Sequence, residues 1–276
     1  MSLDIQDDNN DKDKITKLHS EMKKAAENND LKLMKKLYRK NVNWSTIIFA
    51  IAVDNANFEM MEWLYKYKFP FDDYTFAVAA SRMEKTVNAK KSFSIISKHT
   101  SNKELMNWLF KRRCPISATV FAFAAKKGHL PDMIWLKDVV NCPWDERVYI
   151  GAATNGNIKN LKWLHEHNIP HNASAFEMAV LNGTIDTIKW LYEHGFKYDT
   201  SAFSAAIFDH NIEKLQWMHL RNFSVSKHVM KIARECKDIN VINWLIQYGY
   251  GTIDDMPKES NEIKTITKSL KRVKIQ

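Results

Sequence analysis

Apolar and polar positions recur along this chain with a period of about 27 residues. The clearest copy starts at Asn155 and is repeated from Asn182; in each copy a polar residue precedes a short apolar stretch containing Trp-Leu. The tryptophan of this stretch recurs at Trp63, Trp108, Trp135, Trp163, Trp190, Trp217 and Trp244. Successive steps are 27 or 28 residues, except for one of 45. A fixed period of this size indicates a solenoid of stacked repeats.

The residues around each tryptophan predict a short amphipathic helix, termed helix B. Leu or Met follows the tryptophan and Met, Leu or Ile stands two residues before it, which places apolar side chains on one helix face. Six residues before this position the predicted N-caps are Asp30, Asn57, Asn102, His129, Asn157, Thr184, Asn211 and Asp238. All but His129 are residues that commonly accept hydrogen bonds from the free amides of a first helical turn.

The other half of each repeat predicts a second helix, termed helix A. Its predicted N-caps are Ser45, Asp72, Ser117, Asp145, Asn172, Asp199 and Ser226. Large apolar residues stand four positions after the caps, and most caps also have one directly before them, the spacing of a hydrophobic staple. Seven positions after the caps are Ala52, Ala79, Ala124, Ala152, Ala179, Ala206 and Ala233. We expect neighbouring A helices to approach closely at this alanine column.

The sequence therefore predicts an all-α array of about eight two-helix repeats over residues 15–251, each stacking on its neighbours. The third repeat is eighteen residues longer than the others, around 82–100. This insertion is basic, with Arg82, Lys85, Lys90, Lys91 and Lys98. A solvated loop, an extension of the flanking helices and a basic contact element all remain open for it.

The two ends differ from the array. Residues 1–14 are acidic and polar, without the pattern of a signal peptide, and are predicted to be disordered. Residues 252–276 are basic, and predict either a short helix that caps the last repeat or a loose tail. The longest apolar run, residues 47–53, is too short to cross a membrane, so we expect no membrane span.

Two segments carry a resemblance to a known family. Ala124-Ala125-Lys126-Lys127-Gly128-His129-Leu130 and Ala152-Ala153-Thr154-Asn155-Gly156-Asn157-Ile158 resemble the AAxxGHL signature of ankyrin repeats. Cys142-Pro143-Trp144-Asp145 together with Lys162-Trp163-Leu164-His165 resembles the Trp-rich ankyrin-type arrays of large DNA viruses of protists. The resemblance covers about residues 15–251. It implies a curved ankyrin-type solenoid that acts as an adaptor for other proteins, and interaction with a host if the source is viral.

This chain also departs from the ankyrin pattern. Ankyrin repeats usually have about 33 residues and a Thr-Pro-Leu-His helix start, whereas this repeat has 27 and no such start. Only a few residues are left between helix pairs. We therefore expect the β-hairpin fingers to be reduced or absent, and a partner to contact helix faces instead.

The residue patterns contain no recognisable catalytic group. The best metal candidate is the run from His165 to His171, but Ile169 stands where an HExxH motif needs its second histidine. The spacing of the tryptophans indicates core positions. We expect no enzyme activity, metal or cofactor.

Three cysteines without a CxxC pair favour an intracellular, cytoplasmic protein, with a nuclear location left open. Cys114 and Cys142 occupy equivalent positions in adjacent repeats, which stacking separates by about 10 Å. That separation is too long for a disulfide.

A partner surface is expected where helix A positions vary from repeat to repeat. Candidates two or nine residues after the caps are Tyr74, Lys126, Arg147, Leu181, Phe208 and His228. Leu181 and Phe208 are apolar where solvent is expected, which fits either a binding hot spot or packing on a neighbouring helix. The leading prediction is a scaffold that binds another protein. The net charge of +9 makes binding of nucleic acid or an acidic surface, through the insertion and tail, the alternative.

Overall fold

The structure is a computed structural model that describes residues 4–39, 42–82 and 101–252, with side chains from residue 13 onward. These residues form sixteen α-helices and contain no strand. The predicted all-α architecture of repeated helices is therefore confirmed. None of the helices in these ranges has the length and apolar character needed to cross a membrane.

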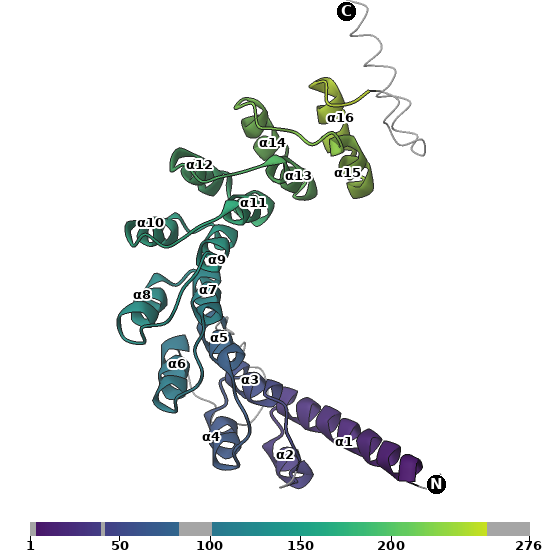
Figure 1. Ribbon diagram of the computed structural model, residues 1–276, viewed down its shortest axis with the longest axis vertical. Helices are drawn as coiled ribbons and strands as arrows, with labels where there is room; N and C mark the ends of the chain where they lie inside the picture. The colour runs from purple at the N-terminus through teal and green to yellow at the C-terminus, as the bar shows by residue number, and fades with distance from the viewer. Residues whose placement is uncertain (1–3, 40–41, 83–100, 253–276) are drawn as a thin grey trace, which may run out of the picture. The chain divides into compact units, whose positions relative to one another are not determined.

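The helices alternate between the two predicted types (Figure 1). The A helices are α1 (Asp4–Glu27), α3 (Ile47–Asp54), α5 (Asp73–Ser81), α7 (Ala118–Lys127), α9 (Arg147–Asn155), α11 (Ala173–Asn182), α13 (Thr200–Phe208) and α15 (Val229–Cys236). The B helices are α2 (Leu31–Leu37), α4 (Phe58–Lys66), α6 (Asn102–Lys111), α8 (Leu130–Asp138), α10 (Ile158–Glu166), α12 (Ile185–Glu193), α14 (Ile212–His219) and α16 (Ile239–Gln247).

The chain divides into two compact units, residues 1–151 and 152–276, with the division inside α9. In the first unit, α1, α3, α5 and α7 pack in succession, and each packs on the B helix that follows it. In the second unit, α11, α13 and α15 pack in succession and likewise contact α12, α14 and α16. Each unit is thus a stack of helix pairs, as the repeat pattern predicts.

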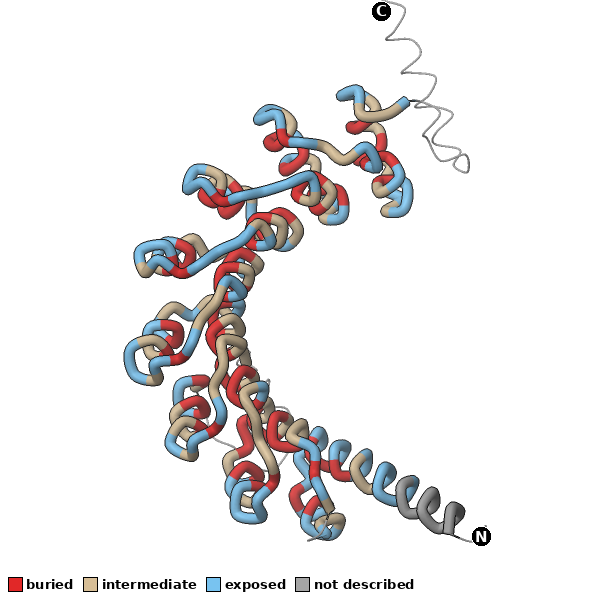
Figure 2. The backbone as a smooth tube through the Cα atoms, viewed as in Figure 1, coloured by how far each residue is buried: buried red, intermediate tan, exposed pale blue. Residues whose placement is uncertain are grey.

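The core of each unit consists of the predicted alanine column and the aromatic residues of the staples. All seven alanines of the column are fully buried. The residues four positions after the caps are buried too, namely Phe49, Phe76, Phe121, Tyr149, Phe176, Phe203 and Met230. In Figure 2 the buried residues follow the facing sides of the helices, while the ends of the B helices are exposed. Small and large side chains therefore alternate along each A helix, which lets adjacent helices interlock.

The tryptophan column also belongs to the core. Trp190, Trp217 and Trp244 are buried, and the others are half-buried. The residue four positions later covers many of the rings, as His194 does on Trp190, with ring centroids 4.0 Å apart. Residues four apart lie on the same face of a helix, so this cover is built into each B helix. The tryptophans serve packing, as predicted.

Most predicted N-caps are confirmed by side-chain hydrogen bonds. These caps are Asp30, Asn57, Asn157, Thr184, Asn211 and Asp238 for B helices, and Asp72, Ser117, Asn172 and Asp199 for A helices. In α9, Asp145 Oδ1 accepts from the amide of Arg147 at 3.0 Å. Local capping chemistry therefore defines most helix starts, as the sequence predicts.

Three predicted helix starts differ in position from the structure, and one predicted cap makes no side-chain capping bond. α6 is capped by Ser101 rather than Asn102, because Ser101 and Glu104 form a reciprocal capping box. His129 makes no capping bond, and its ring contacts Asp132 at 2.9 Å instead. α3 and α15 start one and two residues later than predicted, but Ser45 Oγ accepts from the Ile47 amide at 3.4 Å and Ser226 Oγ accepts from the His228 amide at 3.2 Å.

The N-terminal segment differs from its prediction. Residues 1–14 were predicted to be disordered, but α1 already begins at Asp4. α1 acts as the A helix of the first pair, and its Met22, Ala25 and Ala26 are buried. Acidic residues near a helix N-terminus interact favourably with the helix dipole, so an acidic start is compatible with a helix. The tail (253–276) and most of the insertion (83–100) lie outside the described residues.

Hydrogen bonds link the turns of consecutive pairs within each unit. In the first unit, Asn57 Nδ2 donates to Asn29 Oδ1 at 3.0 Å, and Arg82 Nε donates to the Asp54 carbonyl at 2.8 Å. In the second unit, Thr187 Oγ1 donates to the Gly156 carbonyl at 3.2 Å. The bonds from Arg82 and Thr187 satisfy backbone carbonyls left open at helix ends, whereas the bond from Asn57 joins two side chains.

The deepest of these links uses a lysine. Lys214, on α14, is only 3% exposed. Its Nζ donates to the carbonyls of Val180 at 2.7 Å and Gly183 at 2.8 Å, and it pairs with Asp209 Oδ2 at 2.7 Å. All three of its N–H donors therefore have acceptors, which offsets the cost of burying the charge.

The Lys214→Met variant should lower the free energy of unfolding by about 2 kcal/mol, because buried acceptors and a carboxylate lose their partner. The matched control is Lys231→Met, since Lys231 makes only an exposed pair with Glu235 at 4.0 Å. That pair should contribute less than about 0.5 kcal/mol. Urea denaturation measures both values. Equal effects of the two substitutions would contradict a structural role for Lys214.

The position of Lys214 in the repeat is occupied by Asn160 on α10, which is fully buried. Neither polar atom of its amide has a hydrogen-bond partner among the described residues. In other repeats the same position carries the buried residues Met60, Leu105 and Val241. Asn160→Leu should therefore raise the free energy of unfolding by about 1 kcal/mol, as an unsatisfied amide is removed.

The control for Asn160→Leu is Thr187→Val at the same repeat position. Thr187 loses its bond to the Gly156 carbonyl and its contact with the Thr184 hydroxyl, so stability should fall by about 1 kcal/mol. Chemical denaturation of the unmodified protein and of the two variants measures the free energy of unfolding of each. Destabilisation by Asn160→Leu would show that the amide has a partner in solution.

Candidate interaction surface

Two of the three predicted contact positions of the first unit, Tyr74 and Arg147, are linked through α7 into one surface on α5, α7 and α9. Tyr74 on α5 is 46% exposed, and its ring meets Phe123 of α7 edge-on at a centroid distance of 6.4 Å. Thr119 lies one turn before Phe123 on α7. Arg147 of α9 donates through Nη1 to Thr119 Oγ1 at 3.1 Å. Three consecutive A helices thus contribute to one surface, here termed the α5–α7–α9 surface.

The charge of Arg147 is held in place by Asp145. The guanidinium makes hydrogen bonds of 2.6 to 3.0 Å to both carboxylate oxygens. The hydrogen bond from Arg147 is the main cause that lowers the pKa of Asp145, and the same bond raises the pKa of Arg147. Asp145 therefore orients Arg147 and accepts the amide at the start of α9 at the same time. This arrangement presents an oriented guanidinium on the surface that also carries the exposed Tyr74.

The other predicted contact residues are placed separately. Lys126 is exposed near the end of α7. In the second unit, Phe208 is the last residue of α13 and is 51% exposed, and His228 is exposed before α15. Leu181 on α11 is half-buried, so the two apolar candidates are not equally accessible. Phe208 is the more exposed of the pair.

Phe123 is a surface residue that sequence reasoning missed. It stands six positions after its cap, where other repeats carry Val78, Gly151 and Ala205. The signal was an aromatic ring at a position that holds non-aromatic residues in the other repeats, which also include Ile51, Met178 and Ile232. Its partner Tyr74 comes from another repeat, and this pairing is visible only in three dimensions.

Arg82 belongs to the basic insertion, for which a solvated loop, a helix extension and a basic contact element were left open, and its side chain bonds to a neighbouring turn. Its guanidinium donates to the Asp54 carbonyl, and its own carbonyl accepts from Asn102 Nδ2 at 2.8 Å. Lys85, Lys90, Lys91 and Lys98 lie outside the described residues. Arg82, the basic residue of the insertion that the structure describes, therefore links the end of α3 to the start of α6.

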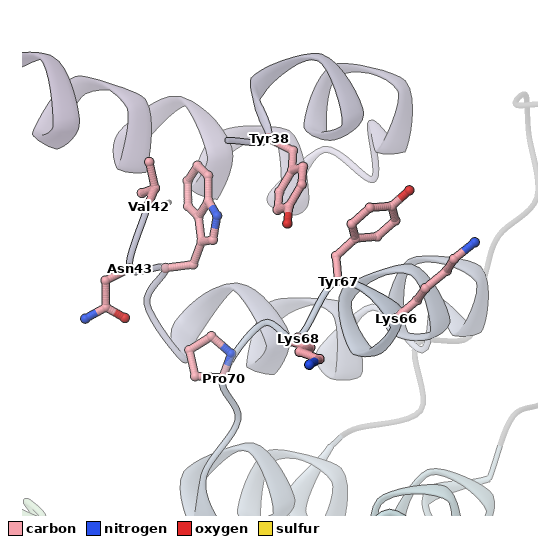
Figure 3. Close-up of a pocket in the computed structure, with 8 residues that line it drawn as sticks. Tyr38, Val42, Asn43, Lys66, Tyr67, Lys68 and Pro70 are labelled. Atoms are coloured by element: carbon pink, nitrogen blue, oxygen red, sulfur yellow. The ribbon is translucent and has the colours of Figure 1, made fainter. Parts of the chain in front are cut away.

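A second feature of the first unit is an open pocket of about 410 Å³. Its lining comes from the end of α2, the segment before α3, and the segment from the end of α4 toward α5; the residues are Tyr38, Val42, Asn43, Trp44, Lys66, Tyr67, Lys68 and Pro70. Figure 3 shows the rings of Tyr38 and Tyr67 side by side, with Lys66 extending beside Tyr67. Most of these residues lie between helices, outside the helical patterns, and the sequence analysis missed the pocket.

The histidine run does not form a metal site in the structure. His167 Nδ1 lies 2.7 Å from the Trp163 carbonyl, and His171 stacks on Phe196 with centroids 3.9 Å apart. Desolvation, followed by the positive charges of His165 and Lys197, lowers the pKa of His171. Within the described ranges no group of three His, Cys, Asp or Glu side chains is arranged to hold a metal ion.

The cysteines are unpaired and unsuited to nucleophilic chemistry. Burial, with the carboxylates of Asp72 and Asp73, raises the pKa of Cys114 to about 12, and burial raises that of Cys142 to about 12. Both thiols lie against backbone carbonyls, Cys114 Sγ at 3.2 Å from Asp72 and Cys142 Sγ at 3.6 Å from Ser117. A thiol with so high a pKa holds almost no thiolate near neutral pH.

A comparison with models of known protein families and with curated protein sequences finds no match to this chain. The fold and the surfaces described above define the class to which the chain belongs, an all-helical repeat protein.

The cysteines should differ in reactivity toward a thiol reagent such as Ellman's reagent at pH 8. Cys236 is only partly buried, so it should react first, although burial and the nearby Glu235 and Asp238 raise its pKa. Cys114 and Cys142 should react only after denaturation, because the thiolate is the reactive form. The Cys236→Ser variant serves as the control and should abolish labelling of the native protein. Fast labelling of that variant would contradict the buried positions of the other two.

Proposed function

We propose that this chain is an ankyrin-type repeat protein that binds another protein through the exposed faces of its A helices. It serves as a scaffold or adaptor and catalyses no reaction of its own. The observation that carries the proposal is the α5–α7–α9 surface, where Tyr74, Phe123 and Arg147 come from three repeats and are held by contacts across neighbouring helices.

The chemistry of this surface suits protein recognition. Tyrosine and arginine are enriched among residues that dominate the energy of protein interfaces. Asp145 and Thr119 fix the Arg147 guanidinium in advance, so the conformational entropy cost of binding a partner is smaller. The buried alanine and aromatic columns beneath supply a rigid support. Constant core positions and variable exposed positions are the division expected of a binding scaffold.

Local geometry supports the ankyrin-type assignment. Gly128, in the segment that resembles AAxxGHL, ends α7 with φ 84°, and Gly156 at the equivalent place has φ 77°. Glycine adopts this left-handed conformation most readily, which favours the glycine of the motif, although Asn29, Ala56, His210 and Lys237 have φ of 50° to 57° at the same place in other repeats. The described residues contain no strand, in agreement with a shortened repeat that lacks hairpin fingers.

The proposed location is the cytoplasm, which is the host cytoplasm if the source is a virus. Free cysteines suit a reducing compartment. The alternative of nucleic-acid binding through the insertion and tail receives no support from Arg82, whose guanidinium donates to a backbone carbonyl.

The test begins with affinity capture from a cell lysate, with and without nuclease, followed by direct binding measurements with the protein that is retained. Tyr74→Ala combined with Arg147→Ala should weaken binding at least 10-fold, as expected for two hot-spot residues. Phe208→Asp tests the second unit in the same assay. Tyr248→Ala is the control, because Tyr248 is similarly exposed, at 40%, but lies after a B helix.

Circular dichroism should show unchanged helix content and melting for each variant. A protein that survives nuclease treatment and no longer binds when Tyr74 and Arg147 are replaced supports the proposal. Retention that disappears with nuclease, or binding that neither the double variant nor Phe208→Asp affects, would overturn it.

A further inference from the structure

The pocket of the first unit combines aromatic rings with lysines and has no carboxylate in its lining. Tyr67 is 39% exposed and Tyr38 is half-buried, so both rings are partly accessible from the pocket. The indole of Trp44 and the ring of Pro70 complete the apolar part. The pocket therefore brings partly exposed aromatic rings together with positive charge.

The lysines of the pocket are available to a ligand. Lys66 and Lys68 are exposed, and the described part of the chain contains no carboxylate paired with either of them. Lys66 Nζ lies 5.9 Å from the centre of the Tyr67 ring, so charge and ring are adjacent. Lys35 and Lys36 add exposed positive charge on α2, from which Tyr38 follows directly. The electrostatic potential around the pocket therefore favours an anion.

The geometry points to a further function, which does not depend on the proposed protein-binding role. We propose that this pocket binds single-stranded nucleic acid, with a base stacked on Tyr67, whose ring meets Tyr38 edge-on at a centroid distance of 5.0 Å, and the adjoining phosphates on Lys66 and Lys68. A volume of about 410 Å³ lies within the range of pockets for small ligands. It is large enough for one nucleotide and is open to solvent.

A single strand fits better than the alternatives for two reasons. Stacking on a side chain needs a base whose face is free, and a duplex keeps those faces covered. A peptide would need an aromatic residue beside an acidic one, whereas every nucleotide carries a ring and a phosphate. The lining offers rings and charges but few groups that would read one particular base, so we expect weak sequence preference.

The stacking half of the proposal is tested with the full chain and fluorescent eight-nucleotide strands of oligo(dT) and oligo(U), measured by anisotropy. Tyr67→Ala should weaken binding about 10-fold, whereas Tyr67→Phe should retain it. Tyr248→Ala is a matched control. Tyr248 has the same repeat position and nearly the same exposure, and it also packs on its tryptophan, with a centroid distance of 4.6 Å.

The charge half is tested by the dependence of affinity on salt. Replacing Lys66 with Ala and Lys68 with Asn should reduce the slope of log K against log salt by about 1.4, or about 0.7 for each phosphate that is no longer neutralised. Lys68 has φ 57°, and asparagine tolerates this left-handed conformation. The control pair is Lys231→Ala with Lys237→Asn, because Lys237 is exposed and has the same φ of 57°.

Binding that prefers single strands and falls with Tyr67→Ala but not with Tyr248→Ala supports the proposal, and comparison of oligo(dT) with oligo(U) shows whether DNA or RNA binds better. A strand containing 2-aminopurine gives an independent readout, since its fluorescence should be quenched by stacking in the unmodified protein and in Tyr67→Phe. Equal binding of duplex, heparin or polyglutamate, or affinity that Tyr67→Ala leaves unchanged, would overturn it.

Discussion

The close approach of adjacent A helices is the constraint on which the rest of the structure depends. The column from Ala52 to Ala233 is fully buried, because a larger side chain would push these helices apart. Gly183 shows how little room is left at such contacts, since a Cβ there would lie 2.7 Å from the Ala153 carbonyl oxygen. With the helices this close, the aromatic residues of the staples fill the remaining space. Each pair then supplies the next with a buried face, so that stability is built from neighbour contacts.

The polar side chains that link the turns differ from repeat to repeat, while the helix packing stays the same. One position holds Thr187 bonded to a carbonyl, Lys214 bonded to three acceptors, and Asn160 without a partner among the described residues. The same site elsewhere holds apolar residues such as Leu105. The backbone geometry thus tolerates different chemistry at one place, and most of the polar groups there find acceptors. This tolerance is what lets repeats diverge while the fold stays the same.

The two proposed binding features lie on different parts of the repeat. The α5–α7–α9 surface belongs to helix faces, where Tyr74 and Arg147 are oriented by neighbours. The pocket belongs to the segments between pairs, where Tyr38 and Tyr67 lie beside lysines. Helix faces are fixed by packing, whereas the connecting segments are free to vary in sequence. A repeat protein of this kind therefore offers two independent places for recognition without disturbing its core.

The sequence by itself determined the all-helical repeat architecture, most helix starts and the core columns. These features depend on local chemistry, namely helix periodicity and capping, which repeat visibly every 27 residues. It also identified Tyr74, Arg147 and Phe208 as exposed positions, because the frame of caps and alanines specifies which face of helix A is outward.

Only the tertiary structure decided the remaining features. The packing of α1 on α2 and α3 buries Met22, Ala25 and Ala26, a contact that no local pattern in the acidic segment reveals. The bond from Arg82 to the Asp54 carbonyl, the burial of Lys214 and the pocket around Tyr67 each join residues about 28 to 35 positions apart in the sequence. Periodicity places residues on a face, but the partner of a side chain depends on which neighbour the folded stack brings within reach.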